Sequence, residues 1–379
     1  MFSFAYALAQ QFYVLGYFYI RNFQSTDTNE VYSFEAYLLT RIFTVLVMVI
    51  TAIGYLFYTD YNYNKVVVIL MLILYRACEA VSDVYQGFFQ QQSRSDLSGK
   101  IQFVRNVATL IVFGIGLALT NELLLSSFLV FLVNFVLIFP LDIAIQKKEF
   151  PDYILKSFKF HHLISAWSIL GACFPLFING YLITAIYNEP KLVIDNLLEQ
   201  GLLNSGIQRD FNILFMPVFV LSLLFFIFRP FTTQLSEHWL NNEQTIFFKK
   251  VNTFFGGMAL LSLLIIASSF IIGPEILGAV YGINLSENRL ALTLLLVAGG
   301  LNVLSMIVDI ILTIFRKQRY LLLAYLLTFI VSKIITKNMI TSLGILGAAQ
   351  SFLLVMMFYL LLSILIYTIV RWNLRKGNQ

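Results

Sequence analysis

The amino-acid sequence predicts an all-α, polytopic transmembrane protein with about eleven helices. Of its 379 residues, 59% are hydrophobic and 12% are charged, which is about half of the ~25% charged residues in soluble domains. The mean hydropathy is +0.82. The apolar runs are mostly about 18 to 27 residues long, the length that a helix needs to span the ~30 Å hydrocarbon core of a bilayer. They lack the alternating pattern of an outer-membrane barrel.

Hydropathy places the expected helices in chain order. They lie at 2–20, 37–58, 65–88, 102–120, 123–146, 162–187, 211–231, 251–272, 290–315, 320–337 and 343–370. The first opens the chain without a basic segment before it, so no cleavable signal peptide is expected. Pro175 and Pro217 are interpreted as kinks within their helices.

A basic loop at 147–161 divides these helices into two groups. Residues 1–150 form an expected N-terminal bundle of five helices, and residues 151–379 form an expected C-terminal bundle of six. The longest external loop is expected at 188–210. No loop is long enough to fold as a separate soluble domain.

The distribution of lysine and arginine predicts the orientation in the membrane. One set of alternate loops, together with the C-terminal tail, contains sixteen of these residues, and the opposite loops contain five. Because cytoplasmic loops carry the excess of basic residues, the C-terminus is predicted to be cytoplasmic. The net charge of +5 is therefore attributed to topology and not to nucleic-acid binding. Eleven crossings would leave the N-terminus outside, and one more helix before the chain would bring both termini to the cytoplasm.

Ionisable residues inside the predicted spans are candidate functional residues, because a membrane interior makes them costly. Arg76, Glu79 and Asp83 lie three and four residues apart in the third segment, which places them on one helical face. Such a stripe either lines a polar cavity or forms an internal salt bridge that fixes helix packing. Arg41 and Arg105 add guanidinium groups, which suit bidentate binding of phosphate. Arg21 and Arg94 lie near the cytoplasmic ends of their segments. Snorkelling to the interface explains Arg21, Arg94 and Arg105 equally well.

The second half contains fewer candidates. Arg229 ends the seventh segment, and Asp309 lies within the ninth. Asp309 is either an ion or proton relay or a polar group in helix packing. Cys78 and Cys173 fall in apolar segments, so neither a disulfide nor a zinc site is expected. The sequence contains no P-loop, G-x-S-x-G elbow or HExxH motif, and we expect no direct ATP drive, no metal and no cofactor.

Several polar stretches recur in an order and spacing that resemble a known family. They are IRNFQSTDTNEVYSFEAYLLTRIFT (20–44), YRACEAVSDVYQGFFQQQSRSDLSGK (75–100), NEPKLVIDNLL (188–198), FMPVFVLSLLFFIFRPFTTQLSEHW (215–239) and LLLVAGGLNVLSMIVDIILTIFRKQ (294–318). The pattern resembles bacterial oligosaccharide flippases of the polysaccharide-transport type, within the multidrug/oligosaccharidyl-lipid/polysaccharide exporter superfamily. The resemblance covers most of the chain. Met1 falls where the second helix of that family begins, so the family's first helix is expected to be missing.

The resemblance implies a function and a place in the cell. Two helical bundles around a central cavity would translocate an undecaprenyl-diphosphate-linked oligosaccharide across the bacterial cytoplasmic membrane by alternating access. The product would serve the biosynthesis of surface polysaccharide, such as the O-antigen of lipopolysaccharide, a capsule or an exopolysaccharide. Expected partners are the lipid-linked oligosaccharide, the phospholipid bilayer, a coupling monovalent cation or proton, and a polysaccharide polymerase.

Site roles follow from this interpretation. The residues expected to contact diphosphate or sugar are Arg41, Arg76, Arg105 and Arg229, and those expected to act in coupling or as polar cavity groups are Glu79, Asp83 and Asp309. Two alternatives stay open. A drug or metabolite antiporter of the same superfamily would share the architecture. A membrane polysaccharide polymerase would be an enzyme and would be expected to carry a large external loop, whereas the loops predicted here are short.

Overall fold

The computed structural model consists of helices and connecting turns, with no strand among the residues that it describes. These are residues 2–25, 27, 30–153, 160–204, 206–224, 235, 238–239, 241, 243–315, 317 and 319–377. The chain forms two compact units, Met1–Thr184 and Ala185–Gln379. The helix α8 (Phe160–Glu199) begins in the first unit and ends in the second.

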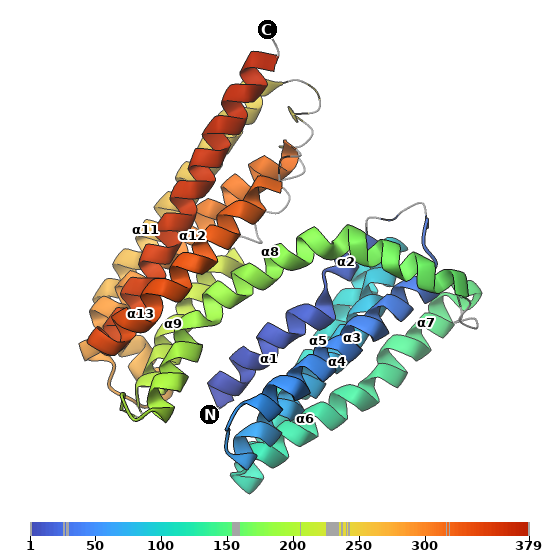
Figure 1. Cartoon of the computed structure of the whole chain (residues 1–379), viewed down its shortest axis with the longest axis horizontal. Coiled ribbons are helices and arrows are strands. Elements are labelled where there is room, and N and C mark those ends of the chain that lie inside the picture. Colours follow the sequence, from blue (N-terminus) through green and yellow to red (C-terminus); the bar gives the residue numbers. More distant parts are fainter. Residues whose placement is uncertain are drawn as a thin grey trace. The chain divides into compact units, whose positions relative to one another are not determined.

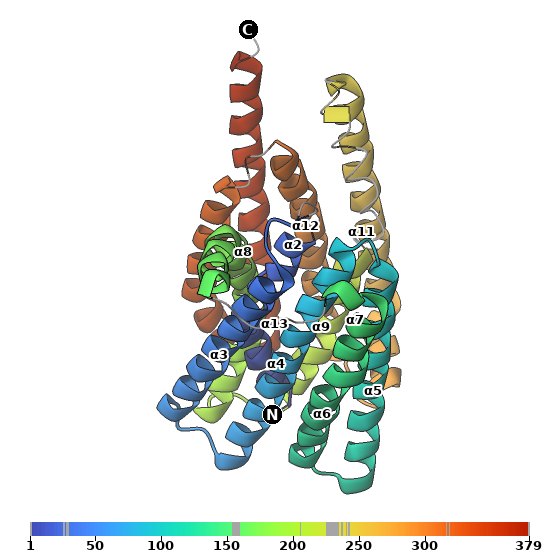
Figure 2. The same cartoon turned by 90° about the vertical axis from the view of Figure 1, so that its right-hand side faces the viewer.

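The first unit is built around one central helix. Its elements are α1 (Phe2–Tyr17), α2 (Ile20–Gln24), α3 (Phe34–Tyr58), α4 (Tyr63–Gln91), α5 (Ser95–Thr120), α6 (Leu123–Leu137), the π-helical turn η1 (Ile138–Ile143), α7 (Ala144–Glu149) and the 3-10 turn η2 (Pro151–Tyr153). The central helix is α4, which packs against α1, α3, α5 and α6 (Figure 1). Figure 2 shows α5 and α6 lying side by side. Polar residues on α4 are therefore surrounded by protein.

Local sequence explains where several of these helices begin and end. The hydroxyl of Ser33 accepts a hydrogen bond from the backbone N–H of Ala36 at the start of α3, as an N-cap residue does. Asn121 adopts a left-handed conformation at the end of α5, which suits asparagine. The break between α1 and α2 is different, because Phe18 and Tyr19 have φ of 43° and 56°. Bulky residues rarely adopt positive φ, and such backbone persists only when tertiary contacts hold it.

The second unit is also arranged around one helix. Its elements are α9 (Ile207–Leu224), α11 (Gln244–Tyr281), the 3-10 turn η4 (Ser286–Asn288), α12 (Arg289–Ile314) and α13 (Arg319–Gly377). The helix α12 packs against α9, α11 and α13. A kink at Gly344, where φ is 57° and ψ is −128°, divides α13 into two helical parts. Those parts correspond to the last two segments predicted by hydropathy.

The exposed surface of the helices indicates whether water or lipid surrounds this fold. Seven helices of the described part are long and apolar enough to cross a membrane. The most apolar stretch of α5 is only 11% buried, against 61% for that of α12. Phe57 and Leu110 are 88% and 73% exposed. Contiguous apolar surface of this kind is not left open to water by soluble proteins. The predicted all-α, polytopic membrane fold is therefore confirmed.

One predicted loop is wrong. The sequence predicts residues 188–199 in the longest external loop, but α8 continues through them to Glu199. The polar side chains of this stretch find partners inside the second unit: Glu189 pairs with Lys333 at 2.5 Å, and Asp195 accepts a hydrogen bond from Gln208 at 2.9 Å. Hydropathy treats such residues as solvent-exposed, whereas here they are buried. The predicted seventh segment, 211–231, extends beyond Leu224 into residues outside the described part.

The first half of α8 belongs with the first unit. Phe177 stacks on Phe18 with ring centroids 4.4 Å apart, and Ser168 shares a hydrogen bond of 2.8 Å with Tyr32. The boundary between the two units, after Thr184, therefore falls within α8 and later in the chain than residue 150. The grouping of the helices into bundles of five and six stays a prediction.

Candidate functional site

A stripe of polar residues runs along α4 in the first unit. Arg76, Glu79, Asp83, Gln86 and Gln90 follow one another at spacings of three and four, so they lie on one face of the helix. At 1.5 Å per residue the stripe is about 21 Å long. In a membrane protein, polar groups along most of a helix must contact protein or water. The partners of this stripe come from α1, α2 and α3.

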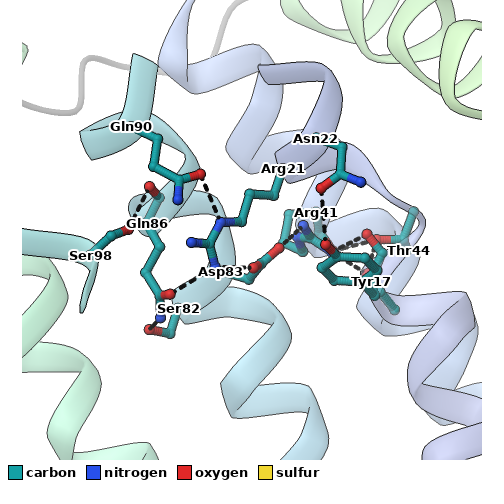
Figure 3. Close-up of polar contacts among 11 residues, drawn as sticks. Tyr17, Arg21, Asn22, Arg41, Thr44, Ser82, Asp83, Gln86, Gln90 and Ser98 are labelled. Carbon is teal, nitrogen blue, oxygen red and sulfur yellow. Dashed lines mark hydrogen bonds and ion pairs between the residues drawn. The ribbon is translucent and has the colours of Figure 1, made fainter. Parts of the chain in front are cut away.

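Asp83 is the centre of the stripe. Its Oδ1 accepts a hydrogen bond from Nη1 of Arg21 on α2 at 3.1 Å, and its Oδ2 accepts one from Nη2 of Arg41 on α3 at 2.8 Å. Figure 3 shows the carboxylate between the two guanidinium groups. Asp83 is buried. A single carboxylate therefore joins three helices.

Arg41 also binds the broken end of α1. Its Nη1 donates to the backbone carbonyls of Gly16 at 2.6 Å and of Tyr17 at 2.5 Å. The hydroxyl of Thr44 donates to the same Gly16 carbonyl at 2.9 Å. The last carbonyls of a helix have no partner within the helix, and Arg41, whose side chain is 0% exposed, supplies one. The left-handed residues after Tyr17 end α1, and the buried arginine binds the carbonyls at that end.

Arg21 reaches the stripe because of that break. Its Nη1 also donates to Oε1 of Gln86 at 2.9 Å, and its Nε donates to Oε1 of Gln90 at 3.1 Å (Figure 3). The short helix α2 begins after Phe18 and Tyr19 and directs the arginine toward α4. Arg21 holds three acceptors on one face of α4.

A second buried ion pair lies on the other side of α4. Nη2 of Arg105 on α5 contacts Oδ2 of Asp142 at 2.5 Å, and Oδ1 of Asp142 accepts from the Ser82 hydroxyl at 2.8 Å. Nε2 of Gln86 donates to the same hydroxyl at 3.2 Å, which links this pair to the Asp83 cluster. Asp142 lies in the π-helical turn η1, and π-turns within helices are frequent at functional sites.

A third cluster surrounds Arg76. Its Nη1 contacts Glu79, and its Nη2 donates to the hydroxyl of Tyr6 on α1. The hydroxyl of Tyr75 donates to Glu79 at 2.8 Å. The guanidinium carbon of Arg76 lies 4.7 Å from the ring centroid of Tyr6 and 5.2 Å from that of Tyr13, which are cation–π distances. The charge of Arg76 is thus held between a carboxylate and aromatic rings.

The three clusters together have a positive balance. Four guanidinium groups face three carboxylates, and these groups are Arg21, Arg41, Arg76, Arg105, Asp83, Asp142 and Glu79. The arginines differ in access: the side chains of Arg21 and Arg76 are 18% and 11% exposed, whereas those of Arg41 and Arg105 are 0% and 3% exposed. We call these seven residues the charged network. Arg229 lies outside the described residues.

Asp309 belongs to the second unit and has different surroundings. Its Oδ2 accepts hydrogen bonds from the hydroxyls of Tyr325 at 2.9 Å and Tyr359 at 2.7 Å, both on α13. Its Oδ1 is buried and makes no hydrogen bond in the described structure. No group of three or more metal-binding side chains was found among the described residues. Asp309 is thus a carboxylate with two neutral donors and one unused oxygen.

Sequence reasoning missed several members of the site. The sequence pattern attributes Arg21 to snorkelling at a helix end and does not single out Asp142 or Gln86. A usable signal existed for Gln86 and Gln90, because they continue the three-and-four spacing that begins at Arg76. Asp142 also had a signal, since it is an acidic residue near the end of an apolar segment.

Asp142→Ala should destabilise the fold, because it leaves the Arg105 guanidinium buried without its carboxylate. Removing one partner of a buried ion pair costs about 3–5 kcal/mol, so the melting temperature in detergent should fall markedly. Replacing both residues, as in Asp142→Leu with Arg105→Met, should restore much of the loss, because no unpaired charge remains. Equal melting temperatures for Asp142→Ala and the unaltered protein would contradict this role of the pair.

Comparison with known proteins gives a match in structure and none in sequence. No family model matches the chain, and no curated protein matches it. Among solved structures, an inward-facing multidrug resistance MATE family transporter of the MOP superfamily superposes with a TM-score of 0.70 at 11% identity, covering 98% of this chain and 88% of that one. A MOP superfamily transporter from Pyrococcus furiosus gives 0.59 at 11% identity, covering 99% and 85%. The Vibrio cholerae MATE transporter VcmN in the bent form gives 0.60 at 12%, covering 97% and 85%. Over nearly its whole length, this chain therefore has the fold of MATE transporters of the MOP superfamily.

Proposed function

We propose that this protein is a membrane transporter that moves a polyprenyl-diphosphate-linked saccharide, undecaprenyl diphosphate being the expected carrier, across the bacterial cytoplasmic membrane by alternating access. The observation that carries the proposal is the charged network in the first unit of a transporter fold. Its guanidinium groups outnumber its carboxylates, and guanidinium is the side chain best suited to diphosphate.

The exposure of their side chains distinguishes two roles among the arginines of the charged network. The side chains of Arg21 and Arg76 retain exposed surface, so these two arginines are proposed to contact the diphosphate. Both terminal nitrogens of Arg41 are engaged, by Asp83 and two backbone carbonyls, and Arg105 is held by Asp142. Direct contact of Arg41 or Arg105 with substrate stays a prediction. Their surroundings support a positioning role.

Export of a drug or metabolite is the second candidate function. It is favoured by one observation, that solved structures with this fold carry the names of multidrug resistance transporters. The charge of the network argues for an anionic substrate instead, because a cationic drug would be repelled by the excess of guanidinium groups. The C-terminus is proposed to be cytoplasmic, from the excess of lysine and arginine on that side.

The decisive experiment measures which leaflet holds the lipid-linked saccharide. The full chain is reconstituted into vesicles with lipid-linked saccharide extracted from the cells that produce the protein, and a membrane-impermeant oxidant reports the outer pool. Protein-containing vesicles should expose nearly all of the saccharide, and protein-free vesicles about half. If the protein leaves the exposed fraction unchanged but exchanges a soluble cationic drug, the antiporter function is correct instead.

Arg76→Ala should slow this translocation by at least tenfold, because one of the two accessible guanidinium groups is lost. Arg76→Lys should recover only part of the rate, since an ammonium cannot bind a diphosphate in bidentate fashion. Lys100→Ala is the matched control, because Lys100 is a cationic side chain that is 75% exposed. Unchanged translocation by Arg76→Ala at equal protein levels would remove Arg76 from the proposed site.

A further inference from the structure

A second stripe, on α1, faces the charged network and is aromatic. Tyr6, Gln10, Tyr13 and Tyr17 lie at spacings of four, three and four, so they share one face of the helix. We call these four residues the tyrosine stripe. From Tyr6 to Tyr17 it extends about 16 Å. Its composition, three phenol rings and an amide, is unusual for a helix face in a membrane, where aliphatic residues normally predominate.

Each ring of the stripe contacts a guanidinium group. Arg76 lies over the rings of Tyr6 and Tyr13 at 4.7 and 5.2 Å, and Arg41 lies 5.6 Å from the ring centroid of Tyr17. The rings of Tyr13 and Tyr17 stack on each other with centroids 5.6 Å apart. The tyrosine stripe and the α4 stripe therefore form one continuous polar and aromatic surface between α1 and α4.

This surface keeps unused binding capacity. Tyr6 is 41% exposed, and Gln10, Tyr13 and Tyr17 are only partly buried. Within the described part of the chain, the Gln10 amide and the Tyr13 hydroxyl make no hydrogen bond. Two polar groups without partners lie beside flat rings, and a ligand with both apolar faces and hydroxyl groups would satisfy both.

The geometry points to the saccharide portion of the transported lipid as the ligand of the tyrosine stripe. A pyranose ring presents a face of C–H bonds, which stacks on the face of an aromatic ring, and an edge of hydroxyls, which pair with amides, phenols, carboxylates and guanidinium groups. A polyprenyl chain would need none of the polar groups, and a diphosphate would need none of the rings. This inference rests on the proposed function, because it divides one substrate between two sets of residues: Arg21 and Arg76 bind diphosphate, and the tyrosine stripe binds sugar.

The test compares two ligands that differ only in sugar. Binding of the purified full-length protein is measured by native mass spectrometry against the lipid-linked saccharide extracted from the producing cells and against undecaprenyl diphosphate without sugar. Tyr6→Leu and Tyr13→Leu should each weaken binding of the saccharide-bearing lipid by roughly tenfold more than binding of undecaprenyl diphosphate. Some loss is expected for both lipids, because both rings also contact Arg76. Tyr6→Phe and Tyr13→Phe keep the ring and should stay within about threefold for both.

The controls separate a sugar site from a structural role. Tyr55→Leu removes a tyrosine on α3 that contacts Phe12 and Tyr61 away from the stripe, and it should change neither affinity. If the leucine variants lose affinity for both lipids equally, or for neither, the tyrosine stripe is not a sugar site and the inference fails alone. If the unaltered protein binds neither lipid, the proposed function fails and this inference fails with it.

Discussion

Asp83→Ala should abolish transport and greatly reduce the amount of folded protein. The substitution leaves two guanidinium groups without their shared carboxylate, since Asp83 binds Arg21 through Oδ1 and Arg41 through Oδ2. The side chain of Arg41 is 0% exposed, so its charge has no access to water. Losing one partner of a buried ion pair costs about 3–5 kcal/mol. The measurements are the monodisperse fraction in detergent and its melting temperature.

A double substitution distinguishes stability from transport. Asp83→Leu with Arg41→Met removes the buried charge together with its partner, so much of the folded yield should return. Transport should not return, because Arg41 no longer binds the Gly16 and Tyr17 carbonyls and Arg21 loses its carboxylate. Asp96→Ala is the matched control, since it removes an exposed carboxylate that pairs with Arg94 and Lys100. Normal folding of Asp83→Ala would show that Asp83 does not hold the three helices together.

Hydropathy and helical periodicity were enough to predict where most of the helices lie and the first three residues of the stripe on α4. Apolar runs fix where a chain can span a membrane, and a period of 3.6 places Arg76, Glu79 and Asp83 on one face. The partners of that stripe could not be predicted. Arg41 and Asp83 are 42 residues apart, and their pairing depends on how α3 packs along α4, which no local pattern encodes.

The position of Arg21 shows a second limit. Sequence reasoning placed it at the end of an uninterrupted helix, where a basic residue reaches the interface. The chain instead breaks at Phe18 and Tyr19, whose positive φ values would be expected only of glycine or asparagine. Tertiary contacts impose this conformation, since Arg41 takes up the freed carbonyls. A tertiary contact also explains why α8 continues through a polar stretch of sequence. Glu189 lies in that stretch, and it is buried and pairs with Lys333.

Asp309→Asn should uncouple transport from an ion gradient while leaving the fold intact. Asparagine keeps an oxygen that can accept the hydrogen bonds from Tyr325 and Tyr359, which bind Oδ2 of Asp309 at 2.9 and 2.7 Å. It cannot take up or release a proton, and it lacks the charge that would attract a monovalent cation to the unpaired Oδ1. We therefore expect a melting temperature close to that of the unaltered protein and at least a tenfold loss of gradient-driven transport.

The measurement uses vesicles with an imposed proton gradient in one series and an imposed sodium gradient in the other. The series that accelerates the unaltered protein identifies the coupling ion, and the Asp309→Asn variant should show the same low rate with and without that gradient. Ser305→Ala is the matched control, because its buried hydroxyl lies one turn earlier on α12 and donates only to the Leu301 carbonyl; it should retain the response. A gradient response that survives in Asp309→Asn would assign Asp309 to helix packing and place the coupling group elsewhere. The distinction is sharp because the two roles predict opposite outcomes for one substitution: a packing carboxylate would alter stability without altering the gradient response, and a coupling carboxylate would do the reverse.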